Sequence, residues 1–189
     1  MGEKERFLEL FSVITRPGKE ALLKWLESSD FFTAPASAKY HGAYEGGLLE
    51  HSLNVYDELV RLKGAYTEFG FSDESIIICS LLHDICKVNF YKPETKNRKN
   101  AEGKWESYQG YGYEEKYTFG FHGPKSVFIL QKYIDLSPEE AAAIANHMGA
   151  FENEKCGDVY ERYPLATLLH WADEAATYLK EGKGEKGNK

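Results

Sequence analysis

Apolar residues recur at helical spacing along most of the chain, and this spacing gives each segment one apolar face. Such a pattern predicts amphipathic helices that pack around a shared core. The stretch from Ile76 to Cys86 differs, because it is apolar on nearly every side, which is typical of a fully buried helix. The expected helices cover residues 4–14, 18–27, 47–63, 72–87, 124–134, 138–148 and 164–180.

Residues 88–121 interrupt the helical pattern. They contain a proline, several glycines and many aromatic residues, and they show no helical period. Residues 105–108 and 111–119 alternate in polarity, which predicts two short strands paired as a small β-hairpin. We therefore expect one all-α domain over residues 1–180, with residues 88–121 as an inserted hairpin or lid. The Gly- and Lys-rich residues 181–189 are expected to form a flexible tail.

Composition narrows the class of protein. The 189 residues carry a net charge of −7, which argues against a general duplex-binding protein, because such proteins usually have a basic face. No apolar run approaches the ~18 residues of a membrane-spanning helix, and the first residues lack the apolar segment of a signal peptide. Three cysteines without regular spacing suit a reducing compartment. We expect a cytoplasmic protein without a membrane partner.

The first sign of chemistry is the pair His83-Asp84 inside the apolar helix. An ionised carboxylate in such a place is costly unless it is paired or bound to a cation. Metal ligation would satisfy both side chains. Taken alone, the two residues are explained equally well by a pair that closes the helix end.

Four further residues stand at comparable places on other expected helices. His51 and Asp173 lie at the border of an apolar face, His122 opens a helix, and His147 lies in a last turn. A single histidine of this kind is usually a packed residue without a metal. Convergence of several such helices by accident is much less plausible, and imidazole with carboxylate suits first-row divalent metals.

The order of these residues resembles the H…HD…D signature of the HD-domain metal-dependent phosphohydrolase superfamily. The resemblance covers roughly residues 40–180 and extends to the surrounding sequence. The first two matching segments are Gly-Gly-Leu-Leu-Glu-His51-Ser-Leu-Asn-Val and Leu-Leu-His83-Asp84-Ile-Cys-Lys87-Val. Phe-His122-Gly-Pro-Lys125-Ser and Asn-His147-Met-Gly resemble segments of small bacterial and phage members that bind two metals. One departure is Pro124, which stands where related sequences often have Glu.

The resemblance implies an HD-domain helical bundle and a site for two divalent transition-metal ions, Mn, Fe, Co, Ni or Zn. Asp84 would bridge them, with His51, His83 and Asp173 on one ion and His122 and His147 on the other. A bridging hydroxide would then attack a phosphate mono- or diester, in a nucleotide or at an oligonucleotide end. Two alternatives remain open: a di-iron oxygenase of the same family, and a nucleotide-sensing regulatory module.

Residues near the expected ligands complete the hypothesis. Lys87 follows Asp84 by one turn and would neutralise a phosphate as a second catalytic residue, or else be a solvated lysine at a helix end. Lys125 opens its helix, where an anion would bind, and His41 precedes the first metal helix. We expect both to contact a small phosphorylated substrate or a single-stranded nucleic-acid end.

Two positions are less determined. Trp105 lies in the insertion beside several basic residues, so it would stack on a base of the substrate or simply belong to an exposed hairpin. His170 precedes Asp173 by one turn but lies further from the core face. It is expected on the surface or in support of a ligand.

Overall fold

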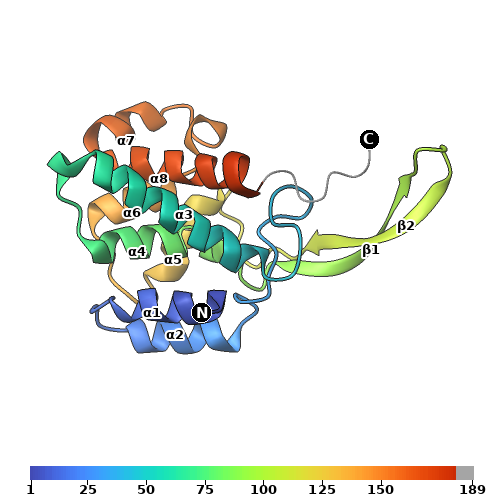
Figure 1. Ribbon diagram of the computed structural model, residues 1–189, viewed down its shortest axis with the longest axis horizontal. Helices are drawn as coiled ribbons and strands as arrows, with labels where there is room; N and C mark the ends of the chain where they lie inside the picture. Colours follow the sequence, from blue (N-terminus) through green and yellow to red (C-terminus); the bar gives the residue numbers. More distant parts are fainter. Residues whose placement is uncertain (182–189) are drawn as a thin grey trace.

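The computed structural model describes residues 1–181, which form eight α-helices and one two-stranded hairpin (Figure 1). The architecture is the expected all-α domain with a small β insertion. None of the helices in this range is long and apolar enough to span a bilayer. The elements are α1 (Glu3–Ser12), α2 (Lys19–Ser28), α3 (Gly47–Ala65), α4 (Asp73–Leu82), β1 (Tyr91–Lys99), β2 (Trp105–Tyr113), α5 (His122–Leu130), α6 (Pro138–Ala145), α7 (Cys156–Arg162) and α8 (Pro164–Ala175).

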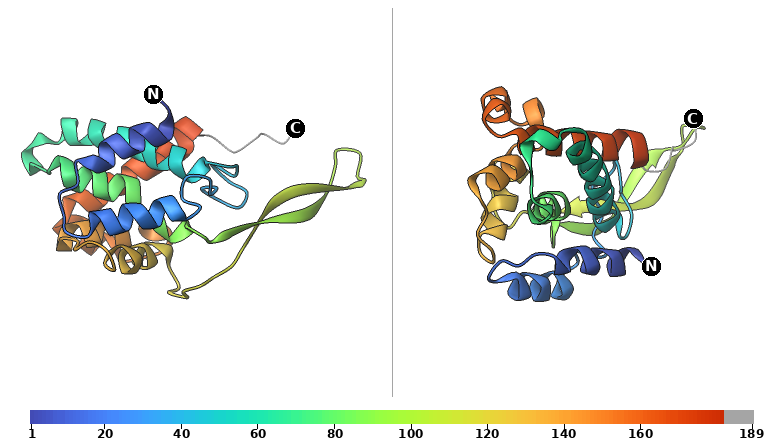
Figure 2. Two further views of the ribbon diagram at one scale, coloured as in Figure 1. Left: turned by 90° about the horizontal axis from the view of Figure 1, so that it is seen from below. Right: turned by 60° about the vertical axis from the view of Figure 1, so that its left-hand side comes forward.

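Helix α4 is the centre of the bundle. Every residue from Ile76 to Leu82 is buried, which confirms the helix predicted to be apolar on all sides. Helix α3 packs against both α4 and α8, and α6 packs against α5 and α8 (Figures 1 and 2). Neighbours on several sides explain why α4 has no polar face.

Helices α1 and α2 cover one side of this core (Figure 2). The turn between them is held by Arg16, whose guanidinium donates to both carboxylate oxygens of Glu140, 2.6 Å each, and to the carbonyl of Asp135. Glu140 also accepts from the backbone of Ser137, while its own backbone N–H donates to the Ser137 hydroxyl. This is the capping box that starts α6. We call Arg16, Glu140 and Ser137 the Arg16 cluster.

Several element boundaries differ from the expectation. Helix α4 ends at Leu82 rather than near Lys87, and residues Ile85–Lys87 form a separate 3₁₀ turn. The short helix α7 was not predicted, because only Cys156 among its seven residues is buried, which leaves no apolar period to detect. Helix α8 continues as a π-helix, Ala176–Glu181. Glu181 therefore belongs to the domain and not to the tail; residues 182–189 lie outside the described residues.

The hairpin exists, but its strands are different from those expected. Strand β1 was missed, and β2 joins the first expected strand to the start of the second, in a register that runs from Tyr91 opposite Tyr113 to Lys99 opposite Trp105. Strand β1 gives no alternating signal because neither of its faces is covered by the core. The turn forms at Asn100, whose side chain accepts from the backbone of Glu102 and Lys104.

The hairpin does not cover the helices as a lid would. It leaves the bundle from the end of the 3₁₀ turn and extends outward, away from the helical body (Figures 1 and 2). The tip of the hairpin is the part that lies furthest from the helices (Figure 1). Trp105, at the tip end of β2, is 71% exposed. Only the segments at its two roots, residues 88–91 and 114–121, return to the bundle.

Candidate metal centre

The structure brings the six residues expected as metal ligands to one place inside the bundle. Helix α3 supplies His51 and α8 supplies Asp173, while α5 begins with His122. His83 and Asp84 follow the end of α4, and His147 lies in the turn after α6. All are buried except His122, whose side chain is 29% exposed. We call these six residues the metal cluster.

Two glycines allow this convergence. A Cβ atom at Gly123 would lie 2.6 Å from the carbonyl oxygen of Ala145, so only glycine lets α5 approach α6 this closely. The approach places His122 Nε2 3.2 Å from His147 Nε2. A Cβ at Gly47 would lie 2.0 Å from the carbonyl oxygen of Gly42, and this contact sets the loop that carries His41 against the start of α3.

Asp84 divides the metal cluster into two halves. Its Oδ2 atom lies 3.5 Å from the Nε2 atoms of both His51 and His83. Its Oδ1 atom lies 3.6 Å from the Nε2 atoms of both His122 and His147. Each carboxylate oxygen therefore faces its own pair of imidazoles, so one carboxylate could be shared between two cations.

Asp173 belongs with the first half. Its Oδ1 atom lies 3.2 Å from His51 Nε2, and one of its carboxylate oxygens also lies within 4.8 Å of His83 and His147. Four overlapping groups of three side chains in this region could each hold a metal ion. They are His41–His51–Glu181, His51–His83–Asp84, His83–His147–Asp173 and Asp84–His122–His147.

The outer nitrogen of each ligand imidazole is occupied. His83 Nδ1 lies 2.9 Å from the Ser80 carbonyl and His147 Nδ1 lies 2.7 Å from the Ile144 carbonyl. His51 and His122 point Nδ1 at carboxylates, Glu181 at 3.0 Å and Glu152 at 2.5 Å. Because these acceptors need a proton on Nδ1, the inner Nε2 of the neutral ring carries a free lone pair, as a metal ligand does.

The Nε2 atoms of the four histidines and the oxygens of Asp84 are better arranged to bind a cation than to hydrogen-bond with one another. The Nε2 atoms of His51 and His83 are 3.2 Å apart, as are those of His122 and His147. Two nitrogens bound to one ion at about 2.1 Å lie about 3.0–3.4 Å apart. Among residues 1–181, no group donates a hydrogen bond to the buried Oδ1 atom of Asp84. Divalent ions between these atoms would satisfy every one of them.

The carboxylates around the metal cluster are held in the ionised form. Burial raises the pKa of Asp84, but Lys87 and His83 outweigh it and hold this pKa well below its usual range. Burial raises the pKa of Glu152 too, but its hydrogen bonds with His122 and the charges of His122 and His147 together outweigh burial and lower this pKa. For Asp173 and Glu181, burial again raises the pKa, and interactions led by those with His51 outweigh burial and lower it. Four negative charges therefore surround the four imidazoles.

His51 takes part in the same balance. Burial lowers its pKa, but the bonds to Asp173 and Glu181 outweigh burial and raise this pKa to about 10. A proton and a metal ion compete for the inner nitrogen of such an imidazole. The carboxylates that attract the proton attract the cation as well.

Lys87 and His41 lie beside the metal cluster. Lys87 Nζ forms an ion pair with Asp84 Oδ2, so it is not a solvated lysine at a helix end. Burial lowers the pKa of Lys87, but the charge of Asp84, the hydrogen bond to Asp84 and the nearby Tyr91 together outweigh burial and raise this pKa. The centre of the His41 ring lies 4.8 Å from that of His51, with the two rings tilted by 41°, and no residue in the described range forms a hydrogen bond with the buried His41 Nε2. Burial lowers the pKa of His41 to about 4.

The other expected site residues lie further away. Lys125 is buried in α5 and forms an ion pair with Glu115 at 2.5 Å. The Nδ1–H of His170 donates to the carbonyl oxygen of His147, 2.7 Å away, so His170 supports the backbone of a ligand. Trp105, on the outer end of the hairpin opposite Lys99, is not brought to the metal cluster.

Sequence reasoning missed Glu152 and Glu181. Glu152 lies in an irregular segment between η3 (Gly149–Phe151) and α7, where no spacing marks it. Glu181 was assigned to the tail, yet it reaches His51 and also accepts from Asn54. The π-helix that carries it is a rare element that is frequent at functional sites. A signal for Glu181 was its position about two turns after Asp173.

Comparisons with known proteins identify the family. The chain is 28% identical over 152 residues to the dihydroneopterin 2',3'-cyclic phosphate phosphodiesterase of Methanocaldococcus jannaschii, covering 78% of this chain and 53% of that protein. The chain thus spans about half the length of this relative. No solved structure gives a significant match. Residues 48–179, more than half of the chain, match the HD domain, and the protein therefore belongs to the HD domain family.

Proposed function

We propose that the protein is a metal-dependent phosphohydrolase that cleaves a phosphate mono- or diester at a centre of two divalent transition-metal ions. The observation that carries this proposal is the position of Asp84 between the two histidine pairs, with one carboxylate oxygen facing each pair. The charge supports the same number of ions. Four carboxylates, Asp84, Asp173, Glu152 and Glu181, lie against one ammonium, so two divalent cations bring the centre close to neutral.

The chain's own residues would orient the substrate around such a centre. Bound ions supply Lewis acidity and make water a better nucleophile. Asp84 would hold both ions at a fixed separation, while the acceptors on the Nδ1 atoms keep the four imidazole rings from rotating. Lys87, already drawn to this point by Asp84, would bind a phosphoryl oxygen and stabilise the charge that develops on it.

His41 would be a further contact to the substrate. Its Nε2 atom is buried and has no partner among residues 1–181, although its ring lies against that of His51. A buried polar atom without a partner costs free energy. A hydrogen bond to an ester oxygen of the substrate would remove this cost.

The archaeal relative supports the phosphodiester class. Its name describes a phosphodiesterase acting on a cyclic phosphate, and its similarity covers 78% of this chain. We therefore place cyclic phosphodiesters of small molecules first among the substrates to test. Nucleoside monophosphates and the ends of single-stranded oligonucleotides come next.

The test combines metal analysis with substrate assays. Protein loaded in turn with Mn, Fe, Co, Ni or Zn is analysed for bound metal and then assayed with those substrates. We expect about two ions per chain and metal-dependent turnover of at least one ester. Oxygen consumption by the iron form without turnover of any ester would favour the oxygenase alternative. Nucleotide binding without either reaction would favour the sensing module.

A further inference from the structure

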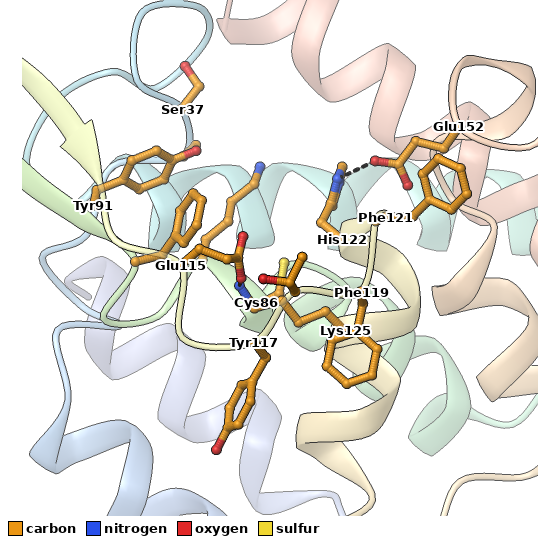
Figure 3. Close-up of a pocket in the computed structure, with 15 residues that line it drawn as sticks. Ser37, Cys86, Tyr91, Glu115, Tyr117, Phe119, Phe121, His122, Lys125 and Glu152 are labelled. Carbon is orange, nitrogen blue, oxygen red and sulfur yellow. Dashed lines mark hydrogen bonds and ion pairs between the residues drawn. The ribbon is translucent and has the colours of Figure 1, made fainter.

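A cavity of about 390 Å³ opens beside the metal cluster. Its size lies within the range of small-molecule sites, about 300–1,000 Å³. It meets the metal cluster at His122, the most exposed of the six residues, and Lys87, which lies beside the metal cluster, also lines it. Figure 3 shows Tyr91 on one side of the cavity, His122 with Glu152 on the other, and Glu115 between them.

The roots of the hairpin build the wall of this cavity. Phe90 and Tyr91 come from the segment that leads into β1, and Phe119 and Phe121 come from the segment that follows β2. Phe119 is 42% exposed and Phe121 is 49% exposed. Large apolar rings that remain open at the mouth of a cavity next to a charged centre are suited to cover an aromatic ring of a ligand.

The cavity also offers a matched pair of polar groups. Lys125 is only 6% exposed, and its ammonium lies 4.6 Å above the Phe90 ring while it pairs with Glu115. The ammonium provides hydrogen-bond donors and the carboxylate provides acceptors at one place on the wall. The edge of a nitrogen heterocycle has the complementary groups, ring N–H donors beside carbonyl or imine acceptors.

We propose that this cavity binds the non-reacting part of the substrate, a planar nitrogen heterocycle of nucleobase size. The inference rests on the proposed function, because the phosphoryl group must reach Lys87 and His122, which line the cavity. The ring would stack against the aromatic wall, and its polar edge would meet Glu115 and Lys125. Recognition would then lie at the roots of the hairpin rather than at its tip, where Trp105 lies.

The test compares substrates with and without a ring. Phe119→Ala removes part of the wall, and Phe69→Ala is the matched control, because Phe69 is 44% exposed and does not line the cavity. For a nucleoside 2',3'-cyclic phosphate, Phe119→Ala should raise KM about 5- to 150-fold, the range expected for one lost stacking contact. KM for glycerol 1,2-cyclic phosphate, which has no ring, should change less than about twofold. Phe69→Ala should change neither value.

A binding measurement separates this inference from the proposed function. Calorimetry with the metal-loaded protein should show that a nucleoside monophosphate binds at least about fivefold more tightly than glycerol phosphate, and that Lys125→Met reduces this preference. Preferential nucleotide binding without turnover of any ester supports the cavity and contradicts the phosphohydrolase. Turnover with equal binding of both ligands contradicts the cavity alone. A KM effect confined to Trp105→Ala would place recognition on the hairpin tip and overturn the inference.

Discussion

The metal cluster and the Arg16 cluster each contain a buried carboxylate, Asp84 in the first and Glu140 in the second, yet the atoms around the two carboxylates are arranged in opposite ways. In the Arg16 cluster, the guanidinium of Arg16 meets both carboxylate oxygens of Glu140, and the helix start at Ser137 supplies a further donor. In the metal cluster, the inner imidazole nitrogens and the Asp84 carboxylate face one another as acceptors without enough donors between them. Imidazole nitrogens lie 3.2 Å from one another, and Asp84 Oδ1 lacks a donor within the described part of the chain.

This difference teaches that burial of charged residues does not by itself mark a functional site. A buried ion pair with complete hydrogen bonding is a structural device, here one that joins the α1–α2 turn to the start of α6. A buried set of acceptors without enough donors is unstable unless a cation completes it. The metal cluster is therefore the candidate centre, although Glu140 in the Arg16 cluster is as buried as Asp84.

Replacing Asp84 tests the comparison most strongly. Asp84→Asn keeps the shape of the side chain but removes the charge shared between the two halves, so we expect loss of both ions. Activity on a confirmed substrate should fall by about 10⁴-fold or more. Elemental analysis of the purified variant measures the first effect. Glu140→Gln is the matched control, since it changes the other buried carboxylate and should retain its metal; full metal content in Asp84→Asn would refute the two-ion centre.

The Arg16 cluster should respond in stability and not in metal content. Arg16→Met leaves Glu140 as an unpaired buried charge, which should reduce the free energy of unfolding by about 3 kcal/mol. Urea unfolding of the metal-free protein measures this loss. The double variant Arg16→Met with Glu140→Met should recover much of it. A drop in metal content of folded Arg16→Met would show that the two clusters are not independent.

The supports of the ligands should have smaller effects than the ligands. Glu152→Ala removes the acceptor that holds His122 Nδ1, and we expect the affinity for one ion to fall about 10- to 100-fold. Metal titration monitored by calorimetry distinguishes the two binding steps. Glu154→Ala, an exposed neighbour, is the control. Equal weakening of both ions would assign Glu152 to the fold as a whole.

The smallest expected effect is the acid sensitivity of the Arg16 cluster. Burial raises the pKa of Glu140, but its hydrogen bonds with Arg16, Ser137 and Ser75 and the charge of Arg16 together outweigh burial and lower this pKa. The stabilisation is thus complete above the unfolded pKa of about 4.3 and is lost as the pH falls through the lower, folded pKa. Unfolding midpoints of metal-free protein between pH 7 and pH 3 should fall more steeply for the native sequence than for Glu140→Gln. Parallel curves would contradict this assignment.

The sequence by itself determined the all-α architecture and the buried central helix, and its resemblance to the HD superfamily picked out the six residues that the structure brings together. The architecture and the central helix are local properties. Helical periodicity reports which face is buried, because each residue turns the helix by a fixed angle. The Ser137–Glu140 capping box is likewise a local property, since it is contained within four residues.

Only the tertiary structure decided which atoms face each other in the site. His51 meets Glu181, 130 residues away, and Arg16 meets Glu140, 124 residues away, and no local period records such contacts. The hairpin was misplaced for a related reason, since β1 buries no face and leaves no pattern of polarity. The division of Asp84 between two histidine pairs and the cavity at the hairpin roots depend on how helices pack. That packing is set by side-chain shape across the whole core.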